Sequence, residues 1–80
     1  MMEWRLMNLM GEYQQKTKQR LSYRTIAEDT GLSKTTIASM ANGKIQRPDL
    51  ETLNAVLTYM TNKLGRALTT DDLLHFEEES

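Results

Sequence analysis

The chain has 80 residues, of which 39% are hydrophobic and 26% charged, and ten Lys and Arg residues against eleven Asp and Glu residues leave a net charge of −1. A chain of this length is expected to form one small domain over residues 1–80, with little surplus stability in its core. The absence of cysteine and the single histidine exclude disulfides and a structural zinc site, and the near-neutral charge counts at first against a nucleic-acid binder.

Several other classes of protein are also excluded. No apolar run approaches the roughly 18 to 20 residues that span a bilayer, and no signal peptide opens the chain, so we expect a cytoplasmic protein without a membrane partner. There is no cysteine nucleophile, no glycine-rich phosphate loop and no cluster of metal ligands. We therefore expect neither an enzyme nor a protein that uses a cofactor, a metal or a small-molecule ligand.

Apolar residues near the start of the chain recur at spacings of three and four, which predicts a helix over about residues 3–16. These residues are Trp4, Leu6, Met7, Leu9, Met10 and Tyr13. Residues 14–20 are polar and basic, and whether they extend this helix or loop out, toward DNA if the chain binds it, stays open.

A short internal repeat follows, because residues 21–27 and 32–38 are identical at five of seven positions. In each copy a serine, Ser22 or Ser33, is suited to cap a helix N-terminus, and the preceding leucine is suited to pack on the isoleucine of the first turn. Helices should therefore begin at about Tyr23 and Lys34. Gly31 is suited to the left-handed turn between them, and the second helix should end at Asn42-Gly43 after Met40.

Two more helices are predicted downstream. Asp49 after Pro48 is the N-cap of an amphipathic helix that ends at Gly65. Residues 69–72 cap a short last helix that runs through Leu73 and Leu74, and an acidic tail covers about residues 75–80. No segment alternates as a strand would, so the expected fold class is all-α, a compact bundle of about five helices.

Two short capped helices joined by a glycine turn, over about residues 22–42, describe a helix-turn-helix, whose second helix enters the DNA major groove. The inner faces would hold Ile26, Leu32, Ile37 and Met40. The outer face of the second helix would then present Ser33, Lys34, Thr35, Ala38, Ser39 and Asn42.

With these residues in place, the sequence resembles the phage-repressor helix-turn-helix family of Cro/CI or Xre-like type, over about residues 4–74. The segments that carry the likeness are Leu21-Ser22, Ile26-Ala27, residues 31–33, Thr36-Ile37, Met40, residues 42–44 and residues 48–53. The resemblance implies a lambda-repressor-like DNA-binding domain.

The resemblance also implies roles for seven positions. Lys34 and Thr35, at the start of the second helix, and Ser39 one turn later look like readers of base edges, where a lysine reaches guanine O6 or N7. Four further residues look like phosphate contacts: Tyr23, Arg24, Asn42 and Lys44. The two repeat copies differ only at their first two helical positions, which are among those expected to face DNA.

The sequence departs from the family pattern in three ways. Glutamine is common in the family where Tyr23 and Lys34 stand, so the DNA contacts differ in detail. Ala41 replaces a frequent glutamate, which removes an ion pair with the first helix. The connection after the first helix is about six residues longer than usual.

We therefore expect a sequence-specific regulator of transcription that binds double-stranded DNA as a homodimer. Of the two regulatory roles, we favour repressor over activator. Leftover apolar residues at one end of the chain would form the dimer interface: Leu68, Leu73, Leu74 and Phe76, or Met1, Met2 and Trp4. The rival reading is an antitoxin or other protein-interaction module on the same fold, which neutralises a partner protein through its acidic C-terminal end. A third reading is the DNA-binding part of a longer regulator.

The charge is unevenly distributed, which answers the objection from the net charge. Residues 14–47 hold seven cations against two carboxylates, net +5, whereas residues 48–80 have a net charge of −5. The basic third contains the helix-turn-helix, and the acidic remainder should limit non-specific binding to DNA.

Overall fold

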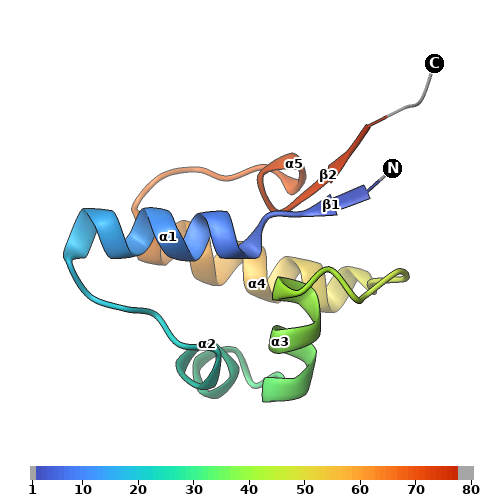
Figure 1. Ribbon diagram of the computed structural model, residues 1–80, viewed down its shortest axis with the longest axis horizontal. Coiled ribbons are helices and arrows are strands. Elements are labelled where there is room, and N and C mark those ends of the chain that lie inside the picture. The colour runs from blue at the N-terminus through green and yellow to red at the C-terminus, as the bar shows by residue number, and fades with distance from the viewer. Residues whose placement is uncertain (1, 78–80) are drawn as a thin grey trace.

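Seven elements follow one another along residues 2–77, the part of the chain that this computed structural model describes (Figure 1). They are β1 (Met2–Trp4), α1 (Leu6–Thr17), α2 (Tyr23–Thr30), α3 (Lys34–Ala41), α4 (Leu50–Leu64), α5 (Thr70–Leu73) and β2 (Leu74–Phe76). In Figure 1, α1 and α4 cross the middle of the molecule, with α2 and α3 below and α5 and the strands above. The helices dominate the described chain, which confirms the expected all-α class with five helices.

The repeated sequence forms a repeated structure at the starts of α2 and α3. The Ser22 hydroxyl accepts a hydrogen bond from the backbone N–H of Thr25 at 3.1 Å, and Ser33 accepts the equivalent bond from Thr36 at 3.0 Å. Both serines have extended backbones and stand directly before the first helical residue. The predicted starts at Tyr23 and Lys34 are thereby confirmed.

Gly31 joins the two helices in the left-handed conformation, with φ of 80°. Its N–H donates to the Ala27 carbonyl at 2.9 Å, which satisfies one of the last carbonyls of α2. A residue with a Cβ would be strained at this φ, so the glycine fixes the sharp turn that sets α3 across α2.

A single apolar core joins the helix-turn-helix to the rest of the chain. Its fully buried side chains come from every helix: Leu6, Ile26, Ile37, Met40, Val56, Met60, Leu64 and Leu73. Helix α4 supplies the longest stripe of this core and packs against both α1 and α2. Two eight-residue helices would not be stable alone, so this packing is what holds α3 in place.

Polar contacts reinforce the α4 interface. The Tyr59 hydroxyl donates to the Asp29 carboxylate on α2 at 2.7 Å, and the Lys16 ammonium on α1 donates to the Leu64 carbonyl at 2.5 Å. Partial burial, and then the bond to Asp29, raises the pKa of Tyr59 above its ordinary value. Lys63 Nζ lies 5.5 Å from the centre of the Tyr59 ring, within range of a cation–π interaction.

The strands β1 and β2 correct several sequence predictions. No strand was expected, and residues 3–5 were assigned to the first helix, which instead begins at Leu6. The last helix was expected to include Leu74, which instead begins β2. The predicted acidic tail was expected to begin at about residue 75, but residues 75 and 76 belong to β2, and residues 78–80 of that tail lie outside the described residues. The strands pair antiparallel in the register Met2 with Phe76, Glu3 with His75 and Trp4 with Leu74. Each has three residues, too few for an alternating pattern to show, and the pairing joins opposite ends of the described chain.

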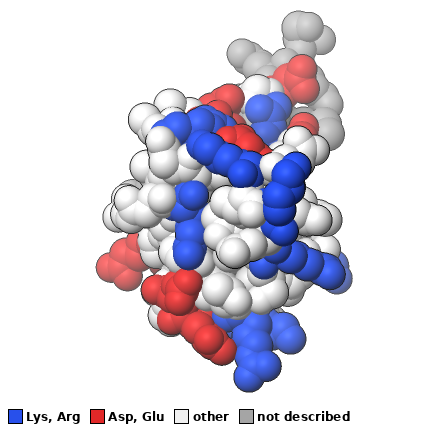
Figure 2. All heavy atoms as spheres, turned by 90° about the vertical axis from the view of Figure 1, so that its left-hand side faces the viewer, with Lys and Arg blue, Asp and Glu red and all other residues white. Residues whose placement is uncertain are grey.

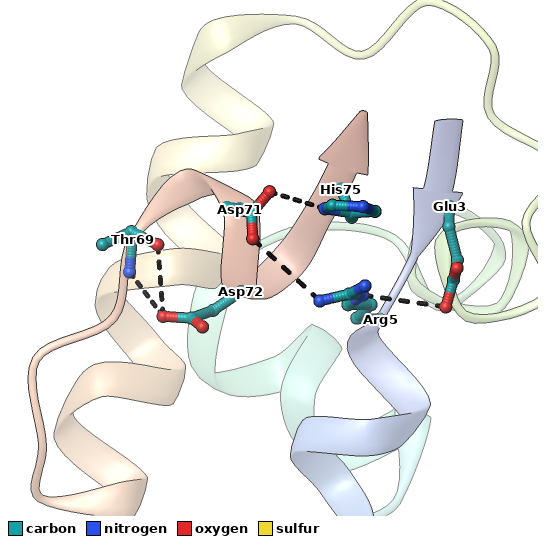
Figure 3. A network of polar contacts seen from close by, with 6 residues as sticks. All are labelled: Glu3, Arg5, Thr69, Asp71, Asp72 and His75. Carbon is teal, nitrogen blue, oxygen red and sulfur yellow. Dashed lines mark hydrogen bonds and ion pairs between the residues drawn. The ribbon is translucent and has the colours of Figure 1, made fainter. Parts of the chain in front are cut away.

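Polar side chains around the two-stranded sheet connect it to the start of α1 and to α5 (Figure 3). Arg5 lies between Glu3 and Asp71, with nitrogen to oxygen distances of 3.7 and 4.0 Å, and the Asp71 carboxylate is also 2.7 Å from His75 Nδ1. The Trp4 indole N–H donates to the Ile45 carbonyl at 2.7 Å, in the connection between α3 and α4. The sheet is thus connected through Trp4 to the segment that follows α3.

Candidate nucleic-acid interface

Helix α3 presents a polar outer face above a buried inner face. Ile37 and Met40 are fully buried, whereas Lys34 and Thr35 are exposed and Ser39 is partly exposed. The period of the helix places Ser39 about one turn after Thr35, so these side chains follow one exposed edge of α3. The three positions predicted to read bases therefore lie together on one helix and are not used by the core.

The first turn of α2 holds two predicted phosphate contacts in different environments. The Arg24 side chain is exposed and lies 3.2 Å from the Glu28 carboxylate one turn later. Tyr23 is partly buried and packs against the core. Such an exposed ion pair contributes little to stability, so Arg24 is available to exchange Glu28 for a phosphate.

The other two predicted phosphate contacts lie beyond the opposite end of α3. The backbone N–H of Asn42 donates to the Ala38 carbonyl and that of Lys44 to the Ser39 carbonyl, at 2.9 and 2.8 Å. Gly43 between them has φ of 73°, which turns the chain after the helix. Both side chains are exposed, and Lys44 has no ion-pair partner among the described residues.

Ala41 is 8% exposed and belongs to the core. The family position that commonly carries a glutamate is therefore occupied here by a small apolar residue that packs inside. A buried carboxylate at this position would need a cationic partner, and the alanine removes that need.

A groove of about 520 Å³ lies between α1 and the starts of α2 and α3. It has apolar lining from Met7, Met10 and Leu21, and three cations also line it: Arg20, Arg24 and Lys34. The structure thus brings one predicted base reader and two predicted phosphate contacts, Tyr23 and Arg24, to the same groove. Thr35, Ser39, Asn42 and Lys44 do not line it.

Arg20 lines this groove, although the sequence analysis gave it no role in binding DNA. The structure answers the question left open over residues 14–20: α1 continues to Thr17, and residues 18–22 form a connection to α2 without regular secondary structure. The sequence feature that could have indicated Arg20 is the series of cations Lys16, Lys18 and Arg20. Charge alone, however, does not show in which direction these side chains point. The fold separates them, because Lys16 binds the end of α4 while Arg20 lines the groove.

Figure 2 shows the end of the molecule where α1 finishes and the connection to α2 begins. Lys and Arg side chains run down one side of this face and gather at its foot, while carboxylates lie at the opposite lower corner and at the top. This face therefore carries a concentration of positive charge along one side and at its foot.

Other kinds of site have little support within residues 2–77. No group of three or more His, Asp or Glu side chains there is arranged to hold a metal ion. The helices of this region are all too short or too polar to cross a bilayer.

A family model described as the Cro/C1-type HTH DNA-binding domain matches residues 5–77. The match leaves out β1 but includes all five helices and β2, so it spans both the helix-turn-helix and the helices that support it. No curated protein and no solved structure shows significant similarity to the chain.

Proposed function

The chain belongs to the Cro/C1-type helix-turn-helix DNA-binding family, and from this premise we propose that it is a sequence-specific repressor of transcription that inserts α3 into the major groove. The observation that carries the proposal is the outer face of α3, where Lys34, Thr35 and Ser39 lie exposed or partly exposed over buried Ile37 and Met40. A rigidly packed helix with polar side chains of this size is suited to read base edges.

The phosphate contacts flank this helix in the proposal. Tyr23 and Arg24 hold the DNA backbone on the α2 side, and Asn42 and Lys44 hold it beyond the end of α3. Contacts on both sides of α3 fix its depth and register in the groove, on which base readout depends. A repressor then acts by occupying DNA that the transcription machinery needs.

We also propose that the protein acts as a homodimer, in the cytoplasm, on two half-sites about 34 to 36 Å apart. The structure narrows the expected interface. Leu73 is fully buried, so we no longer include it in the proposed dimer interface. Trp4 and Leu68 are partly buried against the core. Met2 and Phe76 are 45% and 63% exposed and face each other across the sheet, and Met1 lies outside the described residues. Met2 and Phe76 are the proposed contact between two copies.

Selection of bound sequences from a random pool of double-stranded DNA tests the proposal. The expected result is a motif with two inverted half-sites, and repetition with Lys34→Ala should relax the preference at one base pair of each half-site. A pool that yields no motif contradicts the proposed function. In that case the antitoxin alternative, in which the fold binds a partner protein, becomes the better account.

A further inference from the structure

We propose that the connection between α1 and α2 is a further DNA-binding element, in which Arg20 holds a backbone phosphate in the groove beside the starts of α2 and α3. This inference rests on the proposed function and extends the contact surface beyond the helix-turn-helix itself. It assigns a use to the basic residue in the segment between α1 and α2.

Arg20 is held between two fixed points. On one side, Lys18 adopts the left-handed conformation with φ of 63°, its N–H donates to the Gln14 carbonyl at 2.8 Å, and the N–H of Gln19 donates to the Thr17 hydroxyl at 3.1 Å. On the other side, Leu21 is 5% exposed and belongs to the core. The backbone of Arg20 therefore has little freedom, and a phosphate contact would cost little ordering of the chain.

The charge of the groove is complementary to a nucleic-acid strand. None of the described residues that line it is acidic, while Arg20, Arg24 and Lys34 all line it. Within residues 2–77, neither Arg20 nor Lys34 has an ion-pair partner, and Arg24 pairs only with exposed Glu28. Binding of an anion therefore breaks no buried ion pair.

The position of the groove identifies which anion fits. Lys34 is the first residue of α3, so a strand whose bases meet α3 passes its backbone close to the groove. The apolar lining is suited to the deoxyribose of the same strand, and Met7, which is 57% exposed, offers it a flexible surface. A DNA strand thus accounts for both the cations and the apolar residues.

Salt dependence of binding tests the inference, because each phosphate contact adds a slope of about −0.9 to log K against log salt concentration. Arg20→Gln should reduce the magnitude of this slope by about 0.9 for each protomer bound, weaken binding to all sequences alike and leave the selected motif unchanged. Lys63→Gln is the matched control, since it removes one positive charge from α4 outside the groove. The control should keep the full slope.

A second measurement locates the contact directly. The chain has no cysteine, so Arg20→Cys carries the only thiol and can be labelled with an iron chelate that cleaves nearby DNA backbone. Cleavage is expected at the flank of each half-site, and the same label on Lys63→Cys should leave the DNA intact. Melting curves of the unbound variants confirm that they fold.

The outcomes separate the two proposals. Suppose that the wild-type chain selects a motif. This inference alone is then overturned if the salt slope of Arg20→Gln equals that of wild type, or if the label at position 20 gives no cleavage at the flanks. A wild-type chain that binds no DNA overturns both. Loss of slope that is as large for Lys63→Gln as for Arg20→Gln also overturns the inference, because it would reflect net charge instead of a local contact.

Discussion

Arg66 donates hydrogen bonds from Nε and Nη2 to the two carboxylate oxygens of Glu12, at 2.8 and 2.7 Å, and so joins the segment after α4 to the middle of α1. Two parallel bonds between a guanidinium and a carboxylate form a charge-assisted pair with a defined geometry. The hydrogen bond from Arg66 holds the pKa of Glu12 below its ordinary value. The pair therefore couples folding to pH.

Acid should weaken the fold through this pair. A carboxyl whose pKa is lowered by folding contributes stability above its unfolded pKa, and this contribution is lost as the pH falls through the lowered folded value. Thermal melting of wild type and Glu12→Gln should therefore differ at neutral pH, and the difference should shrink below the ordinary glutamate pKa of about 4.3 and vanish below the lowered folded value. The hydrogen bond from the Thr69 backbone also lowers the pKa of Asp72, so some acid sensitivity remains in Glu12→Gln.

Glu28→Gln is the control for this pH effect, because Glu28 forms only an exposed pair with Arg24. Its melting temperature should follow that of wild type throughout the acid range. A difference between wild type and Glu12→Gln that stays constant from neutral to acid pH would show that Glu12 acts by packing and not by its charge.

The two serine caps should contribute equally to stability because their geometry is the same. Ser22→Ala and Ser33→Ala each remove one bond to an N-terminal backbone N–H, and each should lower the free energy of unfolding by about 1 kcal/mol. Urea unfolding followed by circular dichroism measures this loss. Ser39→Ala is the control, since Ser39 lies within α3 and caps no helix. A loss of the same size for Ser39→Ala would exclude capping as the cause.

Base readout and phosphate contact should separate in mutant binding. Lys34→Ala or Ser39→Ala should cost roughly 1 to 3 kcal/mol on the selected motif and relax specificity at one base pair. Lys44→Ala should weaken binding to all sequences and reduce the salt slope by about one for each protomer bound. Titration of the selected motif and of random duplexes at several salt concentrations measures both quantities. Equal, sequence-independent losses for all three variants would contradict the assignment of Lys34 and Ser39.

Much of the helix-turn-helix could be predicted because its signals are local. Serine caps act within one turn, and a glycine at positive φ is required by the backbone of its own turn, so Ser22, Gly31 and Ser33 each indicate a boundary without knowledge of the rest. Asp49 shows the limit of such signals. It stands at the predicted N-cap of α4, yet its side chain makes no capping hydrogen bond.

The missed features depend on contacts between distant residues. Trp4 fits a helical spacing with Met7, but it lies in β1 because Leu74 pairs with it and Ile45 accepts its indole N–H. Leu73 was assigned to a candidate dimer interface because the last helix is too short to show which of its residues face the core. The structure buries Leu73 completely. The orientation of Arg20 likewise follows from the buried side chain of Leu21 and the turn at Lys18, which composition does not show.

The proposed dimer contact gives the last prediction. Met2 and Phe76 are opposite each other on β1 and β2, and they lie on the same face of the sheet as Trp4 and Leu74, beyond the part that contacts the core. Burial of a phenylalanine side chain contributes about 1.5 to 3 kcal/mol. A homodimer loses two such side chains, so Phe76→Ser should weaken self-association by about a hundredfold or more in sedimentation equilibrium, and binding to two half-sites should weaken with it. Met7→Ser, which alters an equally exposed apolar residue on α1, should leave self-association unchanged, and equal effects of the two variants would place the interface elsewhere.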